Sequence, residues 1–358
     1  MKINLNNIEL FNAASHMIGD EECFLVIPQH IGCKWNKQNM IFRSSVWNSE
    51  GELISAGFKK FFNWGEQPDL VRHPDNMKKV SMPEKMDGSC LIVSKYKGHL
   101  IIRTRGTVDA RNMQNGFEID ELVEKYPKAF SFEDETAGFS RLFEWTTPNN
   151  RIVIDYGDSP DIYFIGKINH ADYSYAKQDV LDAEAVRMGV RRPRMYSFGD
   201  IPDMIRAVHD FKGKEGIVVY FDNDQECRKL KGVEYLTKHS FKSNCSFDAV
   251  LDMFIAEKYP SYSEFEKSIV ETFDFECFEM SRGFVSRICD AYRESVKILD
   301  HMKTFVDNIR DIPTRKEQAL KIIGAYGKTN RSSFAFILLD NKPVTDDMIK
   351  KLIYQITK

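Results

Sequence analysis

The stretch Lys85-Met86-Asp87-Gly88-Ser89 leads directly into the apolar segment from Cys90 to Tyr96. That segment is rich in β-branched and aliphatic residues, which predicts a strand. Because Asp-Gly is a common turn pair, one interpretation is an ordinary charged turn before a strand. In the second interpretation, Lys85 is a nucleophile placed just before a tight glycine turn. Its ε-amine would attack the α-phosphate of a nucleotide and form a covalent phosphoramidate.

That chemistry makes a demand on the rest of the sequence. A free lysine has a pKa of about 10.4, so at pH 7 only roughly one amine in 2,500 is unprotonated. We expect nearby cations to lower the pKa of Lys85, because they disfavour a further positive charge. The same cations would stabilise the charge that develops on the phosphate oxygens. The sequence should therefore supply more lysines, and a carboxylate able to hold a divalent metal ion.

Lys229 and Lys231 meet the first part of this demand. They are two residues apart in a run that follows the predicted strand 216–221, and alternate residues of a strand point to one face. Glu215 and Gly216 begin that strand. The Glu215 carboxylate is predicted to coordinate Mg²⁺ or Mn²⁺, and the glycine permits close approach of a ligand. Taken alone, a Lys-x-Lys pair is more often an exposed strand face.

Short apolar runs predict that the first two thirds of the chain are mostly β. The predicted strands are 91–93, 100–102, 151–154, 162–165 and 216–220, and the predicted helices are 117–126, 177–188 and 200–210. Strand runs separated by occasional helices predict an α+β domain of antiparallel sheets with flanking helices.

After about residue 240 the apolar residues repeat at helical spacing. Thr314 to Glu317 is typical of a capping box that opens a helix, which Gly327 could end. Thr345 and the two aspartates after it fit the start of a terminal helix. We therefore predict two domains, residues 1–240 and an all-α domain of residues 241–358.

Composition excludes several classes of protein. The 358 residues include 50 Lys and Arg against 53 Asp and Glu, a net charge of −3 that argues against a polybasic coating protein. No apolar stretch reaches the roughly 18 residues of a membrane span, and the first twenty residues lack the apolar core of a secretion signal. Seven dispersed cysteines without a C-x-x-C pair indicate reduced thiols. These features predict a cytoplasmic globular protein with no membrane partner.

Two local basic clusters stand out against this balance. Residues 281–331 hold eleven basic and six acidic residues, and four arginines lie at positions 187, 191, 192 and 194. Each cluster is either a solvated surface or a contact for a polyanion.

The motifs described above resemble those of the covalent nucleotidyltransferases. Lys85 to Gly88, Phe143-Glu144, Glu215-Gly216 and Lys229-Leu230-Lys231 follow the order of motifs I, III, IV and V of that superfamily, which contains DNA ligases, RNA ligases and mRNA capping enzymes. Lys59-Lys60-Phe61-Phe62-Asn63 and the long run from Phe143 to Ile154 resemble the RNA ligase 1 family, the bacteriophage tRNA-repair type. The resemblance covers about residues 40 to 240, and it implies that the predicted domain of residues 1–240 is the adenylyltransferase domain.

The resemblance implies a role for each matching position. Lys85 would become adenylylated, Lys229 and Lys231 would contact the α-phosphate, Glu144 would bind the ribose and Glu215 would lie near the metal. The other nucleotide contacts that it implies are Arg43, Lys60, Phe62, Asp87, Gly88, Arg105 and Tyr235.

Some of these matches have departures or plain alternatives. Ser44 stands beside Arg43 where the family has glycine, and Arg105 replaces a lysine, which changes hydrogen-bond geometry. Without the family, Phe62 would be assigned to the core, Tyr235 to a half-buried surface, and Glu144 to an ordinary strand face.

The resemblance implies an ATP-dependent RNA ligase. It would join 5′-phosphate and 3′-hydroxyl RNA ends through a lysyl-AMP intermediate and an adenylylated 5′ end, in RNA repair, with tRNA anticodon-loop breaks as candidate substrates. ATP and Mg²⁺ or Mn²⁺ would be its cofactors. A monomer is expected, in the host cytoplasm if the origin is a phage. The helical domain would influence the choice of RNA.

Three alternatives remain open. A DNA-end ligase or a capping-type nucleotidyltransferase is disfavoured, because the residues after Tyr235 predict helices rather than the strands of an OB-fold. A tRNA-binding adaptor without turnover is disfavoured because Lys85, Glu215, Lys229 and Lys231 are all present.

Overall fold

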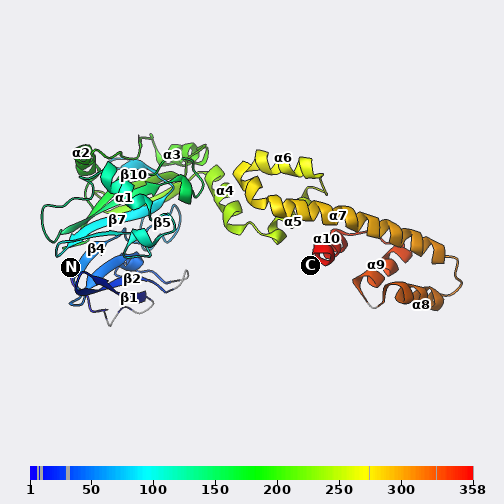
Figure 1. Cartoon of the computed structure of the whole chain (residues 1–358). Coiled ribbons are helices and arrows are strands. Elements are labelled where there is room, and N and C mark those ends of the chain that lie inside the picture. Colours follow the sequence, from blue (N-terminus) through cyan, green and yellow to red (C-terminus); the bar gives the residue numbers. More distant parts are fainter. Residues whose placement is uncertain (6–7, 9–10, 30–32, 274, 328, 358) are drawn as a thin grey trace. The chain divides into compact units, whose positions relative to one another are not determined.

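The computed structural model describes residues 1–357 except 6, 7, 9, 10, 30–32, 274 and 328 (Figure 1). The chain divides into two compact units, Met1–Leu236 and Thr237–Lys358. The boundary predicted near residue 240 falls within α4 (Val233–Asn244). Strands lie in the first unit, and the described part of the second unit contains helices alone, as predicted.

Three sheets build the first unit. The first has the order β1 (Phe11–Ile18), β2 (Glu21–Pro28), β3 (Ser45–Asn48) and β4 (Leu53–Ala56). The second has the order β10 (Asp161–Asn169), β9 (Phe139–Thr146), β7 (Ser89–Tyr96) and β8 (His99–Arg103). The third has the order β11 (Met195–Tyr196), β6 (Met82–Lys85), β12 (Gly216–Phe221), β13 (Glu226–Lys231) and β5 (Phe62–Asn63).

The pairing is antiparallel within the first two sheets, and in the third sheet β13 and β5 pair in parallel. The predicted α+β class with antiparallel sheets is therefore confirmed. Four of the five predicted strands lie in β7, β8, β10 and β12. The fifth prediction, residues 151–154, is wrong, because this segment forms no strand.

Alternation along the strands positions the second and third sheets. On one face of the second sheet, Leu91 and Phe143 pack with α1 (Glu118–Lys125) and α2 (Gln178–Met188). On its other face, Ile92 and Leu142 join Tyr220 of the third sheet in one apolar cluster. The far face of the third sheet is covered by α3 (Ile201–His209), whose side chains join the apolar residues beneath that sheet.

The second unit is built from α5 (Phe247–Ala256), α6 (Tyr262–Thr272), α7 (Phe275–Ile309), α8 (Arg315–Tyr326), α9 (Asn330–Leu339) and α10 (Asp346–Thr357). Their buried faces share one core that includes Phe254, Phe265 and Phe278. The predicted start of α8 is confirmed, since the Thr314 side chain accepts a hydrogen bond from the backbone of Glu317. In the described ranges, every helix is too short or too polar to cross a bilayer.

Both basic clusters are extensively ion-paired. Arg191 forms an ion pair with Asp161, and Arg192 Nε lies 2.8 Å from Asp182 Oδ1. Four basic residues of α7 each pair with an acid three positions earlier, namely Arg282, Arg293, Lys297 and Lys303, and Arg310, which directly follows α7, pairs in the same way. This spacing is the ordinary pairing of a solvated helix face. It therefore favours a solvated surface, rather than a contact for a polyanion, for the basic residues of α7.

Candidate active site

One face of the third sheet gathers the predicted lysines. Lys85, the last residue of β6, lies opposite Gly216, which in turn lies opposite Lys231 on β13. Lys229 is two residues earlier on β13 and lies opposite Asn63 on β5. Partners across a ladder and alternate residues along a strand share a face, so these side chains all project to the same side of the sheet.

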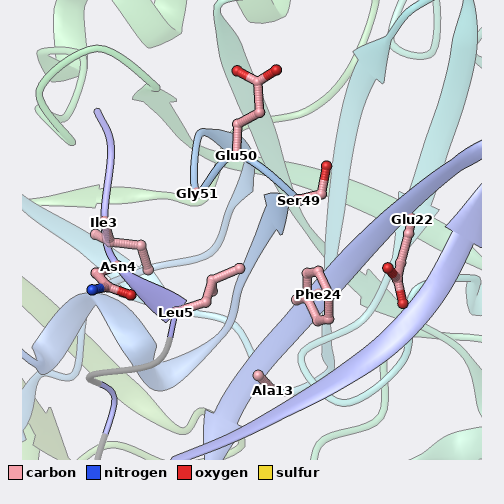
Figure 2. Close-up of a pocket in the computed structure, with 9 residues that line it drawn as sticks. All are labelled: Ile3, Asn4, Leu5, Ala13, Glu22, Phe24, Ser49, Glu50 and Gly51. Carbon is pink, nitrogen blue, oxygen red and sulfur yellow. The ribbon is translucent and has the colours of Figure 1, made fainter.

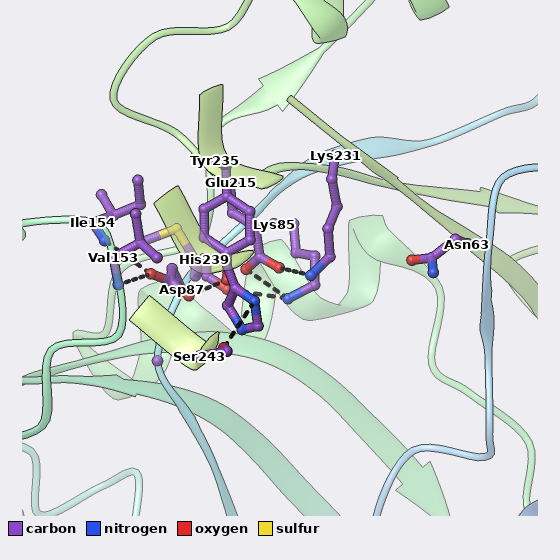
Figure 3. A network of polar contacts seen from close by, with 12 residues as sticks. Asn63, Lys85, Asp87, Val153, Ile154, Glu215, Lys231, Tyr235, His239 and Ser243 are labelled. Atoms are coloured by element: carbon purple, nitrogen blue, oxygen red, sulfur yellow. Dashed lines mark hydrogen bonds and ion pairs between the residues drawn. The ribbon is translucent and has the colours of Figure 1, made fainter. Parts of the chain in front are cut away.

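A buried carboxylate holds two of these lysines. The Glu215 side chain is 2% exposed, and its Oε2 lies 2.7 Å from Lys85 Nζ while its Oε1 lies 2.9 Å from Lys231 Nζ (Figure 3). Each of the two lysine side chains is 20% exposed. Glu215 thus bridges the predicted nucleophile and one of the predicted phosphate contacts, at positions far apart in the sequence.

The charge state of Lys85 differs from the expectation. Burial disfavours its ammonium form, but the carboxylates of Glu215, Glu144 and Asp87 outweigh burial and raise the pKa of Lys85. The prediction that surrounding cations lower this pKa is therefore wrong for this arrangement, because the closest charge to Lys85 is negative. Lys85 is held here as an ammonium ion.

The lowered pKa belongs instead to Lys229. Burial, followed by the charges of Arg43, Lys85, Lys231 and Lys60, lowers the pKa of Lys229 to about 7. The Lys229 ammonium nitrogen lies 5.2 Å from the centre of the Phe61 ring, and the Arg43 guanidinium carbon lies 5.0 Å from the same ring. Cations that repel one another in this way are suited to a polyanion, because each phosphate charge relieves their mutual repulsion.

Asp87 anchors the surrounding loops. Its Oδ2 accepts hydrogen bonds from the backbone N–H groups of Val153 (2.7 Å) and Ile154 (2.9 Å), and its Oδ1 accepts one from the Tyr235 hydroxyl (2.8 Å) (Figure 3). The Tyr156 hydroxyl accepts from the Asp87 backbone. These bonds help to explain why residues 151–154 form no strand, since Asp87 takes the backbone donors of Val153 and Ile154.

Gly88 and Glu144 form the side of the site nearest β6. A Cβ atom at Gly88 would lie 2.4 Å from the Trp145 carbonyl oxygen, so a larger residue does not fit. The Gly88 N–H donates to Glu144 Oε1 at 3.1 Å. Burial raises the pKa of Glu144 to about 7; Lys85 opposes this shift and Glu215 adds to it. Glu144 can therefore exchange a proton near neutral pH.

The remaining predicted contacts lie around these groups. Lys60 Nζ lies 5.2 Å from the centre of the Phe62 ring, and Arg105 is exposed in the segment after β8. The Phe62 ring is 4% exposed and packs in the core under the opposite face of the third sheet. Phe61, not Phe62, contacts the cations of Arg43 and Lys229. A nucleotide contact for Phe62 stays a prediction that this placement does not support.

One residue that the sequence analysis missed is Arg103. Its guanidinium is fully buried at the end of β8 and donates to side-chain and backbone oxygens of Ser44 and Ser55 at 2.7–3.3 Å. Ser44 follows Arg43 and donates its hydroxyl to the Arg105 carbonyl. Arg103 therefore fixes the segment that carries Arg43. The signal available in the sequence was an arginine ending the apolar run 100–102.

The metal prediction rests on Glu215. In the described part of the chain no group of three or more His, Cys, Asp or Glu side chains is placed to hold a metal ion. Mg²⁺ is commonly bound by one or two carboxylates together with substrate phosphates, so a single buried glutamate beside a phosphate site fits that mode.

A separate cavity of about 620 Å³ opens beside β1 and β2 (Figure 2). Glu22 and Glu50 are among the residues that line it, and none of the predicted site residues does. Two carboxylates would repel a polyphosphate, so this cavity does not compete with the lysine face as a nucleotide site.

Comparison with known proteins gives a family match for the part of the chain that carries these residues. The sequence model of the RNA ligase family matches residues 40–248, more than half of the chain. An RNA ligase of Rhodothermus phage RM378 is 24% identical over 303 residues, covering 65% of this chain and 68% of that protein. A protein of Autographa californica nuclear polyhedrosis virus, named "putative bifunctional polynucleotide kinase/RNA ligase", is 26% identical over 212 residues. That match covers 53% of this chain, and the chain spans only 29% of the viral protein.

Among solved structures, an archaeal ATP-dependent RNA ligase is 16% identical with a TM-score of 0.45, covering 75% of each chain. The family match includes every predicted site residue from Arg43 to Tyr235. It agrees with the resemblance to the RNA ligase 1 type, and it shows that this chain belongs to the RNA ligase family.

Proposed function

We propose that this chain is an ATP-dependent RNA ligase that joins 5′-phosphate and 3′-hydroxyl RNA ends. The proposal rests on one observation: Lys85, Lys229 and Lys231 share a face of the third sheet, and the buried Glu215 pairs with Lys85 and Lys231. This face offers one amine as a nucleophile and several cations for the phosphate that the amine attacks.

In the first step, the Lys85 amine forms a bond to the α-phosphorus of ATP, and the bond from that phosphorus to pyrophosphate breaks. Lys229 and Lys231 would offset the negative charge on the α-phosphate. Lys85 must first lose a proton, which Glu215 opposes as long as the two are paired. A cation that binds Glu215 would remove the carboxylate from Lys85, and the neighbouring ammonium groups would then lower the pKa of Lys85.

Glu215 would hold the divalent metal ion in this scheme, and Asp87 would remain the anchor of the loops. A bound Mg²⁺ or Mn²⁺ supplies positive charge that polarises the phosphate and stabilises its transition state. All other contributions come from the side chains already described.

Two further transfers complete the proposed reaction. AMP passes from Lys85 to the 5′-phosphate of an RNA, so that the nitrogen–phosphorus bond breaks and a 5′-5′ pyrophosphate forms. A 3′-hydroxyl then attacks the RNA 5′-phosphorus, forming the phosphodiester as AMP leaves. Each step places an anion against the same cations, so one cluster can serve all three.

The finer assignments rest on the family. We propose RNA repair as the setting, with broken tRNA anticodon loops as one substrate, and a monomer acting in the cytoplasm. Residues 1–240 would carry the chemistry and the helical unit would influence the choice of RNA. Removing the helical unit should then alter RNA preference more than self-adenylylation, and equal loss of both would contradict this division.

The test is sealing of matched strands. The chain is incubated with ATP, Mg²⁺ and single strands that carry a 5′-phosphate and a 3′-hydroxyl, once as RNA and once as DNA. We expect RNA to be sealed through an adenylylated 5′ end and Lys85→Ala to be inactive. Sealing of DNA alone would favour the DNA-end ligase, and the absence of any adenylylated intermediate would overturn the proposal.

A further inference from the structure

Asn63 lies on the lysine face and no motif assignment uses its side chain. It ends β5 opposite Lys229, and Figure 3 shows it on the side of Lys231 away from Asp87. Its Nδ2 donates to Glu66 Oε1 at 2.7 Å, and its backbone N–H donates to Glu66 Oε2 at 2.9 Å. The Asn63 Oδ1 atom is buried and meets no hydrogen-bond partner among the residues that the structure describes.

The orientation of this amide is fixed by its partner. Burial favours the protonated form of Glu66, but hydrogen bonds from Asn63 and the charges of Lys229 and Lys60 outweigh burial and lower the pKa of Glu66. An ionised carboxylate only accepts hydrogen bonds, so the amide nitrogen must face Glu66 and Oδ1 must point away from it. A buried acceptor without a partner costs free energy, which a ligand donor could recover.

The chemistry of the pocket limits what this donor can be. Phosphate oxygens are acceptors at neutral pH and gain nothing from a second acceptor such as Asn63 Oδ1. A hydroxyl group is a donor, and the proposed reaction brings ribose hydroxyls to this face. Two candidates follow: the ribose of the adenosine and the terminal ribose of the RNA end that attacks.

The order of strands in the third sheet distinguishes the adenosine ribose from the terminal ribose of the attacking RNA end. Lys85 lies on β6 and Asn63 on β5, three strands apart, which corresponds to roughly 14 Å across the sheet. Glu144 and Gly88 lie at the Lys85 side of the face, where the nucleoside is placed by the proposed function. In-line displacement puts entering and leaving groups on opposite sides of the phosphorus. When AMP leaves toward Lys85, an attacking hydroxyl that arrives from the Asn63 side satisfies this geometry.

We propose that Asn63 Oδ1 accepts a hydrogen bond from the terminal ribose of the 3′-hydroxyl RNA end and so positions its 3′-oxygen for the sealing step. This inference rests on the proposed function. The new bond joins the 3′-oxygen to the 5′-phosphorus, the bond from that phosphorus to AMP breaks, and the hydroxyl proton passes to solvent. The amide takes no proton and acts through placement alone.

The experiment separates the steps in the full-length protein. Asn63→Leu keeps the approximate size of the side chain and removes the acceptor. It is assayed for lysyl-AMP formation with ATP, and for sealing of an RNA strand that already carries the 5′-adenylyl pyrophosphate to an RNA with a 3′-hydroxyl. We expect sealing to fall about tenfold, as for one lost hydrogen bond, while lysyl-AMP formation stays within roughly threefold.

Two further variants control the result. Asn12→Leu changes an exposed asparagine on β1 and should leave both reactions unchanged. Glu66→Gln lets the Asn63 amide flip, because glutamine both donates and accepts, so it should slow sealing in the same direction but by less. Thermal unfolding of each variant checks that the fold is retained.

Unchanged sealing by Asn63→Leu, or an equal loss of both reactions, would overturn the inference while leaving the proposed function intact. If Asn63→Leu does not fold, Glu66→Gln is used in its place: slower sealing with unchanged lysyl-AMP formation supports the inference, and unchanged sealing or an equal loss of both reactions overturns it. Failure of the unmodified protein to form lysyl-AMP or to seal would overturn the proposed function itself, and this inference with it.

Discussion

Binding of a nucleoside triphosphate should be accompanied by uptake of a proton at Lys229. Burial and four neighbouring cations lower the pKa of Lys229 to about 7, so a large share of this amine is neutral at mildly alkaline pH. Phosphate oxygens placed beside it favour the ammonium form and raise the pKa again. The bound state therefore holds more protons than the free state.

The size of the effect follows from the pKa. With a pKa of about 7, only about 9% of Lys229 is charged at pH 8, so full charging takes up about 0.9 proton; the figure falls to about 0.5 at pH 7 and about 0.1 at pH 6. The sign is fixed by linkage. Because binding consumes a proton, affinity should weaken as the pH rises above 7, and it should depend little on this group below pH 6.

Isothermal titration calorimetry measures this directly. The non-reacting analogue α,β-methylene ATP is titrated with Mg²⁺ at pH 8 in buffers of different ionisation enthalpy, and the dependence of the heat on the buffer gives the number of protons. Lys229→Met is the matched control, since it keeps the length of the side chain and cannot be protonated. Glu144, whose pKa is about 7, is mostly ionised at pH 8. The number of protons taken up on binding should be greater by almost one in the unmodified protein than in Lys229→Met, and equal numbers would contradict a lowered pKa at Lys229.

Three other outcomes are expected. Glu215→Gln leaves Lys85 and Lys231 without their shared carboxylate, so the free energy of unfolding in urea should fall by about 1–3 kcal/mol. The loss should be smaller than for a fully buried pair, because the two lysines are partly exposed. An unchanged free energy of unfolding would mean that these ion pairs do not stabilise the fold. Gly88→Ala should lower the stability by about 1–3 kcal/mol and suppress lysyl-AMP formation, since its Cβ would overlap the Trp145 carbonyl; wild-type behaviour in both assays would contradict this packing. Because the net charge is −3, RNA affinity must come from local cations. For four phosphate contacts, the affinity measured by fluorescence anisotropy should fall roughly 50-fold between 50 and 200 mM salt. An affinity that does not change with salt would exclude binding through the phosphates.

The lysine face could be predicted because strand periodicity is local. Lys229 and Lys231 are two residues apart, so their shared face follows from the alternation of a strand. The same alternation puts Phe62 and Asn63 on opposite faces, and the pairing of Asn63 with Lys229 decides which of them joins the site. That pairing joins segments far apart in sequence and could not be inferred from either segment alone.

The errors have a common physical origin in long-range polar contacts. Glu215 is 130 positions from Lys85 in the sequence, so a count of the cations in the motifs could not predict that it pairs with the Lys85 amine and raises the pKa of Lys85. Residues 151–154 have the composition of a strand, but Asp87 takes two of their backbone donors. The helices of the second unit were easier, because one buried stripe at helical spacing specifies each of them.

The most direct measurement is the identity of the residue that carries AMP. The full-length protein is incubated with α-labelled ATP and Mg²⁺, digested, and the labelled peptide is located by mass spectrometry. We expect one adenylyl group on Lys85, in a linkage that acid cleaves and alkali leaves intact, and no label on Lys85→Ala. A label on Lys229 or Lys231, or labelling of Lys85→Ala at the wild-type level, would contradict it.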